Sequence, residues 1–398
     1  MKHDEILKLL YLLSSVGVGR PRIWELMRIY GSFDEIYSAL KRTLSSDANA
    51  VNFFTPSELK SAAAVNENQL EKLIGYCADE GIDIIGYNDE RYPIRLRRIF
   101  NSPILLFCKG NTELISANAV MAVVGTRRPS EYSRGVTRRV CSKLAKDGMI
   151  VASGFAVGTD IEAHLSAVRA GGKTISVLGT GIGAEYPEQN MQYYNEILRN
   201  GVFVSEFFPN SQGNRSSFKM RNRILSGLAL GTVVVEAADR SGSLNTASHA
   251  ISQGKDLWVV PPHDIFDERY AGNAKLTADG AIPLLSDTDI INEYFENISH
   301  KPVKDSVLDA PFLHAKIKPG KELREAYEGK AGMPVSNDSE FEGDEKTVYD
   351  IIKKARGGIS PDEVAEISGL DIADVLMIIT ELEISGAVRS ETGQEYYA

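Results

Sequence analysis

The chain has 398 residues, a length that indicates two or three domains at roughly 150 residues each. Hydrophobic residues make up 43% and charged residues 25% of the chain, a balance that excludes wholesale disorder. The net charge of −10 argues against a nucleic-acid partner unless basic residues gather locally. Residues 101–290 carry 19 Lys and Arg against 18 Asp and Glu, whereas residues 291–398 carry 12 against 22, so a basic site in the middle of the chain stays possible.

The sequence predicts a cytoplasmic protein without a membrane anchor. Its first residues, MKHDEILKLLYLLSS, place acids before a short apolar run and lack the cleavage pattern of a signal peptide. No segment approaches the roughly 18 apolar residues that span a membrane. Cys77, Cys108 and Cys141 lie far apart without a CxxC pair, which fits a reducing compartment and predicts no zinc ribbon.

Residues 1–80 are predicted to form a helical domain. Apolar positions three and four apart in HDEILKLLYLLSS and RPRIWELMRIYG indicate two helices. Between them, VGVGRPRIWELM is a glycine turn followed by a helix start, with Pro21 near the first turn. Such a turn resembles the helix-hairpin-helix that grips the DNA backbone, and the simpler interpretation is a tight turn in a small bundle.

Residues 81–295 are predicted to form a doubly wound α/β domain. Short apolar runs alternate with helical stretches, and glycine, proline or a polar turn bounds each run. The six runs are AVMAVVG, MIVASG, TISVLG, VFVSEF, TVVVEA and DLWVVP. They indicate a parallel sheet covered on both faces, which binds ligands beyond the carboxyl ends of its strands.

The first of these strand ends carries two cations. MAVVGTRRPS places Gly125, Thr126, Arg127, Arg128 and Ser130 directly after a buried run. A dinucleotide site would have GxGxxG here, and no second glycine is in reach. Because a guanidinium pairs bidentately with phosphate and a helix start near Ser130 adds amides, the loop predicts phosphate binding. The alternative is that the arginines form ion pairs within their own domain.

Three further strand ends add polar groups to the same edge of the sheet. ASGFAVGTDIEAH turns twice before a helix begins, and LGTGIGAEYPEQN has three glycines where backbone can approach a ligand. VVVEAADRSGSLNTASHA opens a helix after a run of small hydroxyl residues. The candidate binding residues at these ends are Ser153, Gly154, Gly158, Ser241, Gly242 and Ser243.

A second basic cluster lies in SSFKMRNRILSG, where three cations and an aromatic ring are expected just before a helix. Its members are Phe218, Lys219, Arg221, Asn222 and Arg223. Arginines on phosphates and a stacking face on Phe218 would suit a single strand of nucleic acid. Cations at a helix N-terminus oppose the helix dipole, so a bound anion would relieve them. The alternative is that Phe218 is a core residue and the basic side chains only snorkel.

Neither a catalytic site nor a metal or cofactor is predicted. His164 and His249 lie in apparent helices without the spacing of a metal site, and a core or capping role suits them better. No GxSxG elbow or P-loop accompanies the candidate carboxylates, and no nucleophile stands out. These carboxylates are Asp160, Glu162, Glu236 and Asp239.

The end of the chain is predicted to be a linker, residues 296–343, and a winged-helix domain, residues 344–398. Three helical segments, EKTVYDIIKKA, SPDEVAEISG and DIADVLMIITELEISG, precede the hairpin AVRSETGQEYYA. The third helix has no Lys or Arg, which major-groove recognition normally needs, and we expect a protein-contact module or a spacer. Its acids are Asp371, Asp374, Glu381 and Glu383.

These motifs together resemble the family of DNA-processing protein A (DprA, also called Smf). The resemblance is strong over about residues 80–285, and the flanking regions agree in arrangement. The motifs that occur in the family's order are VVGTRRPSEYS, ASGFAVGTDIEAH, GGKTISVLGTGIGAEYPEQN, VSEF, FKMRNRILSGLA, VVVEAADRSGSLNTASHA and GNAKLTADGA.

The resemblance implies a non-catalytic bacterial protein that binds single-stranded DNA. It implies an extended Rossmann-like domain between a SAM or helix-hairpin-helix-like domain and the winged helix, and a homodimer that protects incoming DNA during natural transformation and helps load the RecA recombinase. The family's GSR loop falls on Gly125–Arg127 and its FPxRNR segment on Phe218–Arg223. Thr126 stands for the usual serine, Lys219 for proline, and Pro262-His263 for Pro-Gly.

Two other functions stay open at this point. One is an enzyme related to the lonely guy nucleotide phosphoribohydrolases, which carry PGGxGTxxE where this chain has DRSGSLNTASHA. Ser248 and His249 lie near the expected place of the needed glutamate, which disfavours this activity. The other is a nucleotide sensor, which would bind mononucleotides in preference to oligonucleotides.

Overall fold

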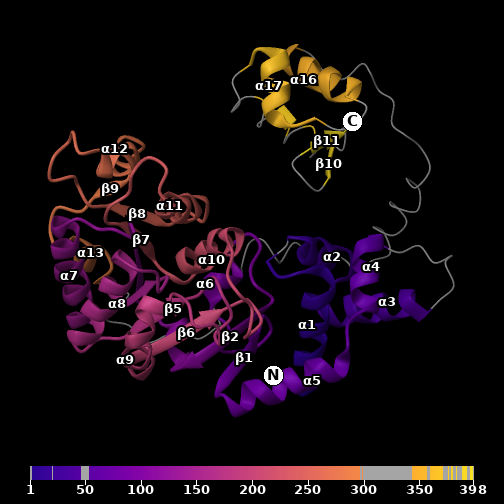
Figure 1. The fold of residues 1–398 in the computed structure, drawn as a ribbon, viewed down its shortest axis with the longest axis horizontal. Helices are drawn as coiled ribbons and strands as arrows, with labels where there is room; N and C mark the ends of the chain where they lie inside the picture. The colour runs from indigo at the N-terminus through magenta and orange to yellow at the C-terminus, as the bar shows by residue number, and fades with distance from the viewer. Residues whose placement is uncertain are drawn as a thin grey trace. The chain divides into compact units, whose positions relative to one another are not determined.

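The chain forms two units, residues 1–320 and residues 321–398, in a computed structural model (Figure 1). The structure describes residues 2–19, 21–45, 53–295, 298, 343–355 and 359–370, together with 375, 378, 379, 382, 388–391 and 395–397. Each unit is described by itself.

A nine-stranded sheet lies at the centre of the first unit. The six strands expected from the sequence are β3 (Val120–Val124), β4 (Ile150–Ser153), β5 (Thr174–Val177), β6 (Gly201–Ser205), β7 (Gly231–Val234) and β8 (Asp256–Val259). They pair in parallel in the order β6-β5-β4-β3-β7-β8, so the doubly wound fold is confirmed.

Three strands of this sheet were not expected. β1 (Ile82–Gly86) and β2 (Leu105–Gly110) pair antiparallel at one edge, and β2 pairs antiparallel with β6. The two-residue strand β9 (Ile282–Pro283) follows β8 at the other edge. The sheet is therefore mixed, with a parallel centre and an antiparallel edge, whereas the sequence predicted parallel strands alone.

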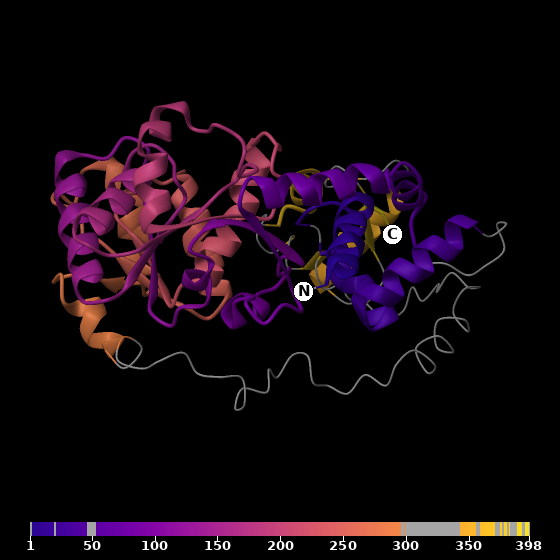
Figure 2. The same ribbon diagram turned by 90° about the horizontal axis from the view of Figure 1, so that it is seen from below.

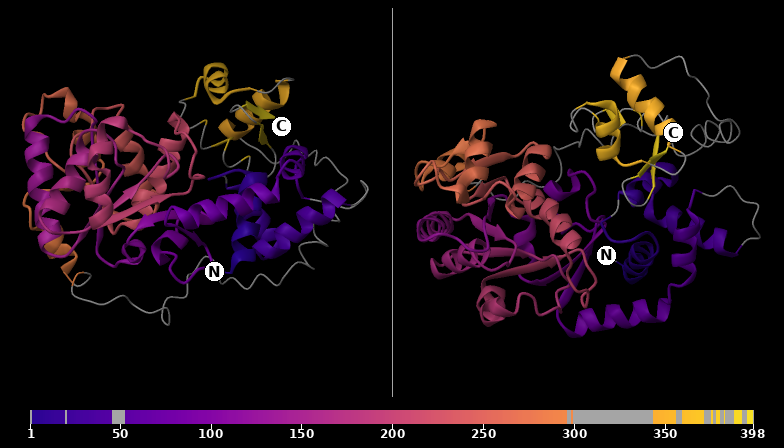
Figure 3. Two further views of the ribbon diagram at one scale, coloured as in Figure 1. Left: turned by 60° about the horizontal axis from the view of Figure 1, so that its bottom comes forward. Right: turned by 45° about the horizontal axis from the view of Figure 1, so that its top comes forward.

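Helices cover both faces of the sheet (Figures 2 and 3). They are α6 (Ile94–Arg97), α7 (Glu131–Lys146), α8 (Thr159–Arg169), α9 (Tyr194–Asn200), α10 (Arg215–Leu228), α11 (Gly242–Ser252), α12 (Ala271–Ala278) and α13 (Asp289–Glu293). Along β3, Val120, Ala122 and Val124 share a core with α10 and α11, while Met121 and Val123 share a second core with α7 and α8. This alternation explains why every residue of β3 is apolar.

The order of the strands places a switch point at β3. The chain passes from β3 to β4 on one side, and only after β6 does it return to form β7 on the other side. The loops after β3 and β7 therefore leave the sheet in opposite directions. Ligands of open α/β sheets bind in the crevice that such a reversal creates.

The region before the sheet is helical, as expected. Its helices are α1 (His3–Val16), α2 (Arg22–Tyr30), α3 (Phe33–Ser45), α4 (Pro56–Ala63) and α5 (Glu67–Asp79). They share one hydrophobic core with the sheet and with α10. In the turn between α1 and α2, Gly17 and Gly19 have φ of +100° and +70°, and a Cβ on Gly19 would collide with Met220 of α10. The turn therefore packs directly against α10.

The second unit contains α16 (Gly343–Lys354), α17 (Pro361–Ser368) and the antiparallel hairpin of β10 (Arg389–Glu391) and β11 (Glu395–Tyr397). These elements agree with the winged helix expected there. Most of the linker and the third helix, with the acids Asp371, Asp374, Glu381 and Glu383, lie outside the described residues. Within the described residues, no helix has the length and apolar character needed to cross a membrane.

Candidate functional site

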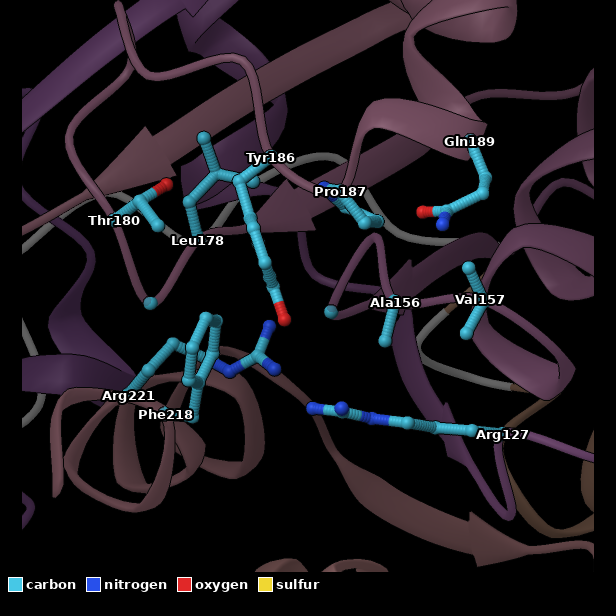
Figure 4. Close-up of a pocket in the computed structure, with 12 residues that line it drawn as sticks. Arg127, Ala156, Val157, Leu178, Thr180, Tyr186, Pro187, Gln189, Phe218 and Arg221 are labelled. Atoms are coloured by element: carbon cyan, nitrogen blue, oxygen red, sulfur yellow. The ribbon is translucent and has the colours of Figure 1, made fainter. Parts of the chain in front are cut away.

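A pocket of about 250 Å³ lies at the carboxyl ends of β3, β4 and β5, where α10 crosses them. Four segments build its walls (Figure 4). The lining residues are Arg127 after β3; Gly154, Ala156 and Val157 after β4; Leu178, Gly179, Thr180, Tyr186, Pro187 and Gln189 after β5; and Phe218 and Arg221 of α10. None of these side chains is a carboxylate, so the pocket suits an anion.

Glu236, in the loop after β7, holds both ends of the loop after β3, residues 125–130, which carries Arg127. The Glu236 carbonyl accepts from the Thr126 amide at 2.8 Å. The Glu236 carboxylate, only 1% exposed, accepts from the Ser130 amide at 2.9 Å and from the Ser130 hydroxyl at 2.7 Å. The sequence left Glu236 as a candidate for proton transfer, and the structure places it as a support for this loop.

The arginines of this loop are free to meet a ligand. Arg127 and Arg128 are both exposed, and neither has an ion-pair partner in the part of the chain that the structure describes. The alternative that they form ion pairs within their own domain therefore has no support. Ser130 caps α7 by accepting from the Ser133 amide at 3.2 Å, as the predicted helix start requires.

Two glycines let the loops after β3 and β4 touch. A Cβ on Gly125 would lie 2.6 Å from the hydroxyl of Thr159, and Gly158, at φ +89°, would place one 2.6 Å from the Arg127 backbone. The Thr126 carbonyl accepts from the Thr159 amide at 3.2 Å and hydroxyl at 3.0 Å. These contacts fix the Arg127 backbone relative to the wall that begins at Gly154.

Arg221 reaches the pocket from α10 and is 6% exposed. Its Nη1 donates to the Val177 carbonyl, and its Nε donates to Asn222 Oδ1 at 3.1 Å. Burial lowers the pKa of Arg221; the buried Asp160 opposes this effect and the cation of Arg127 adds to it. Figure 4 shows the side chains of Arg127 and Arg221 extending toward each other. An anion between them would reduce their repulsion.

An aromatic pair forms another wall. The rings of Tyr186 and Phe218 lie 5.2 Å apart at an angle of 38°. Tyr186 is 40% exposed and Phe218 is half-buried, so Phe218 is not simply a core residue. A Cβ on Gly179 would collide with the Phe218 ring, which explains one glycine of the LGTGIG loop.

The basic cluster of α10 lies within the helix and not before it. α10 begins at Arg215, more than two turns earlier than the expected start near Ile224, because Asn214 and Ser217 form a reciprocal cap. The expectation that these cations crowd a helix N-terminus is therefore wrong, and the dipole argument does not apply to Arg221 or Arg223.

Arg223 points away from the pocket. It is 4% exposed and pairs with Glu206, 2% exposed, at 2.5 Å. Asn222 donates to Asn245 at 3.1 Å and joins α10 to α11, while Lys219 is exposed. Of this cluster, Phe218 and Arg221 alone line the pocket.

The other predicted site residues lie around the pocket and not in it. Ser153 is buried, and its hydroxyl donates to the Val123 carbonyl at 2.6 Å. Ser241 caps α11, which begins at Gly242, and its hydroxyl lies 2.7 Å from that of Ser243. Of the named candidate binding residues, four line the pocket, Arg127, Gly154, Phe218 and Arg221, and the glycines noted in the loop after β5 add Gly179. The sequence analysis missed Tyr186, although an aromatic residue inside a glycine-rich strand-end loop could have signalled it.

The two candidate histidines lie in helices outside the pocket lining. His164 is fully buried in α8, with ring nitrogens 2.6 Å from the Thr174 hydroxyl and 3.2 Å from the Ser176 hydroxyl. Burial lowers its pKa to about 3, so the ring is neutral at physiological pH. His249 is half-buried in α11, and burial also lowers its pKa. Among the described residues, no group of three or more His, Cys, Asp or Glu side chains could hold a metal ion.

Fold and pocket together define a doubly wound α/β protein with a strand-end pocket that two arginines line, and a winged-helix unit. Residues 83–295 match the family described as DNA recombination-mediator protein A, and residues 336–394 match the DprA winged helix domain. The chain belongs to the DprA/Smf family.

Relatives and solved structures agree with this assignment. The DNA processing protein DprA of Bacillus subtilis is 32% identical over 256 residues, which cover 63% of this chain and 86% of the relative. The crystal structure of DprA from Streptococcus pneumoniae has a TM-score of 0.61 at 28% identity and covers 74% of this chain and 98% of its own. A structure of DprA from Helicobacter pylori, described for its single-stranded DNA binding mode, has a TM-score of 0.50 at 29% identity and covers 54% and 96%.

Proposed function

We propose that the pocket binds single-stranded DNA, with a backbone phosphate between Arg127 and Arg221 and an unpaired base near Tyr186 and Phe218. One observation carries this proposal: two guanidinium groups from different segments converge beside an aromatic pair in a pocket without a carboxylate. Phosphate contacts and stacking on aromatic rings are how proteins hold single strands without reading sequence. A duplex would keep its bases paired and out of reach of the rings.

The family supports the wider role. The Helicobacter pylori relative is described by its single-stranded DNA binding mode, and the two arginines of the pocket lie in the motifs shared with the family. We infer that this chain processes DNA in the cytoplasm during transformation, that it acts as a homodimer, and that it helps to load RecA onto the bound strand. These steps follow from the resemblance.

We propose that the protein is not an enzyme. The position where the related phosphoribohydrolases need a glutamate falls near Ser248 and His249 of α11, and Ser248 is exposed while His249 is half-buried. The buried carboxylate of Glu236 is engaged by Ser130 and Tyr270. A nucleotide sensor remains the competing function, and the length dependence of binding separates the two.

Fluorescence anisotropy with labelled oligonucleotides of increasing length, at two salt concentrations and with duplex and AMP as competitors, tests the proposal. We expect single strands to bind more tightly than duplex, with affinity that rises with length and falls steeply with salt. Arg127→Ala should weaken every sequence similarly by about tenfold, the effect of losing one charge-assisted phosphate contact.

Arg139→Ala is the matched control for this test. Arg139 is equally cationic and 76% exposed, and it lies in α7 outside the pocket lining. We expect its loss to change affinity by less than about twofold, because screened surface charges contribute little. Equal binding by Arg127→Ala and the native protein would remove the pocket from consideration, and tight binding of AMP without length dependence would favour the sensor.

A further inference from the structure

Phe155, in the loop after β4, has an unusual backbone conformation. Its φ is +60°, in the left-handed region that bulky side chains avoid. Asn101 is the other described residue besides glycine with a positive φ, and asparagine tolerates this region far better than phenylalanine. A strained residue persists only where its surroundings hold it, and such residues cluster at ligand sites.

Two sets of contacts hold Phe155. Its ring, 2% exposed, packs edge-on against Phe203 at 5.2 Å and lies 6.4 Å from the ring of His164. Its carbonyl oxygen accepts from the side-chain amide of Asn190 at 2.8 Å. Asn190 is 3% exposed and follows the loop after β5. The ring anchors the side chain, and the Asn190 bond fixes the direction of the strained peptide.

The residues on either side of Phe155 form a wall of the pocket. Gly154 precedes it and packs so closely on Arg221 that a Cβ there would collide with the guanidinium. Ala156 and Val157 follow it and line the pocket, as does Gln189, the neighbour of Asn190 (Figure 4). The bond from Asn190 to Phe155 therefore joins the wall after β4 to the wall after β5.

We propose that Asn190 is a positioning residue for the ligand of this pocket, holding Phe155 in its strained conformation so that Gly154 stays against Arg221. This inference rests on the proposed binding of single-stranded DNA. Without the Asn190 amide, the Phe155 peptide loses the partner that fixes its direction and relaxes toward an ordinary conformation. Gly154 and Val157 then move, and the two walls no longer hold their spacing around Arg221.

The test replaces Asn190 by leucine, which has a similar size, no charge and no donor. We expect Asn190→Leu to weaken binding of labelled single strands about tenfold, since displacements near 1 Å at a binding site have effects of this order or larger. Asn195→Leu is the matched control, because Asn195 is exposed in α9, five residues further along the chain. This control should bind as the native protein does.

A second measurement separates positioning from a general loss of folded protein. In an Arg127→Ala background the pocket no longer engages the strand fully, so Asn190→Leu should cost much less affinity than in the native background. A merely structural role would reduce affinity by the same factor in both backgrounds, and that result would overturn the proposal. Far-ultraviolet circular dichroism checks folding; if Asn190→Leu does not fold, Asn190→Asp, which keeps the size and lacks the donor, takes its place.

The outcomes for the proposed function are distinct from these. If the native protein fails to bind single strands, or Arg127→Ala binds as tightly as the native protein, the proposed function fails. If the native protein binds and Arg127→Ala does not, while Asn190→Leu binds as the native protein does, the positioning role of Asn190 fails and the function stands.

Discussion

Replacing Arg223 by methionine distinguishes two roles for this residue. The family motif suggests that Arg223, two residues after Arg221, contacts DNA. The structure instead places it in a buried pair with Glu206 on the side of α10 that faces the α1–α2 turn, where a Cβ on Gly19 would lie 3.4 Å from its Nη2. We expect Arg223→Met to affect stability far more than binding.

The magnitude follows from the burial of the pair. The side chains of Arg223 and Glu206 are 5% and 2% exposed, and one contact of 2.5 Å joins them. Arg223 Nε, Arg223 Nη1 and Glu206 Oε1 are buried without a hydrogen-bond partner in the part of the chain that the structure describes. Removing the cation leaves a buried carboxylate alone, which costs about 3–5 kcal/mol of the free energy of unfolding.

Protonation of Glu206 sets how that cost depends on pH. Burial raises the pKa of Glu206, and the attraction of Arg223 opposes this rise. Arg223→Met removes the opposing attraction, so the folded variant binds a proton more readily than the native protein. The variant should therefore be less destabilised at pH 5.5 than at pH 8. Adding Glu206→Leu should recover most of the loss, because an apolar pair carries no desolvation penalty.

Urea unfolding followed by tryptophan fluorescence measures the stability of the first unit, residues 1–320, which contains Arg223. The two tryptophans of the chain, Trp24 and Trp258, both lie in residues 1–320, so the signal does not report the winged helix. Binding of single strands by the folded variant should keep the salt dependence of the native protein. If Arg223→Met is instead as stable as the native protein and its log–log salt slope falls by about one, Arg223 contacts a phosphate and our reasoning is wrong.

Two further predictions concern buried groups. Because the pKa of His164 is about 3 in the folded protein and 6.5 in the unfolded chain, protonation of the unfolded chain should reduce stability by about 2 kcal/mol between pH 7 and pH 5. Urea unfolding of His164→Gln should show a smaller drop over this range, and an unchanged drop would contradict the neutral core role. Glu236→Gln should weaken the two bonds from Ser130 to this side chain and loosen the loop, costing about 1–3 kcal/mol of stability and weakening DNA binding several-fold, while the bond from the Thr126 amide to the Glu236 main-chain carbonyl remains. Tyr270→Phe is its control. It removes the 3.2 Å bond to the same carboxylate and the hydroxyl's contacts with Ser130 at 2.8 Å and Ser133 at 2.6 Å, but leaves both Ser130 bonds to Glu236 in place, and it should have the smaller effect on binding.

The centre of the sheet could be predicted from local sequence, and its edge could not. Strands β3 to β8 are buried apolar runs, and each has the glycine or polar turn that ends a strand. β1 and β2 contain similar runs, IDIIG and LLFCKG. They pair with each other, and the pairing that adds them to the sheet joins β2 to a strand far along the chain, where Cys108 pairs with Val204 of β6. Antiparallel addition at an edge depends on that distant pairing, which no local period reveals.

Pocket residues could be predicted from the sequence where they directly follow a buried strand. Arg127 and Gly154 directly follow buried strands, so their position at the binding edge follows from the fold class. Tyr186 and Asn190 come at the end of a long loop after β5, and their roles depend on contacts with Phe218 and Phe155. Nothing within GAEYPEQN indicates these partners, because both lie in other segments of the fold.

The start of α10 explains why the sequence assigned two arginines to one role. A helix advances about 100° per residue, so Phe218 and Arg221, three apart, lie on one face, as do Met220 and Arg223. The two faces are about 200° apart. With the helix starting at Arg215, one face meets the pocket and the other meets the turn at Gly19. Reading Asn214 and Ser217 as a cap would have placed these residues inside the helix. It would also have separated Arg221, which lines the pocket, from Arg223, which pairs with the buried Glu206 and secures the helix.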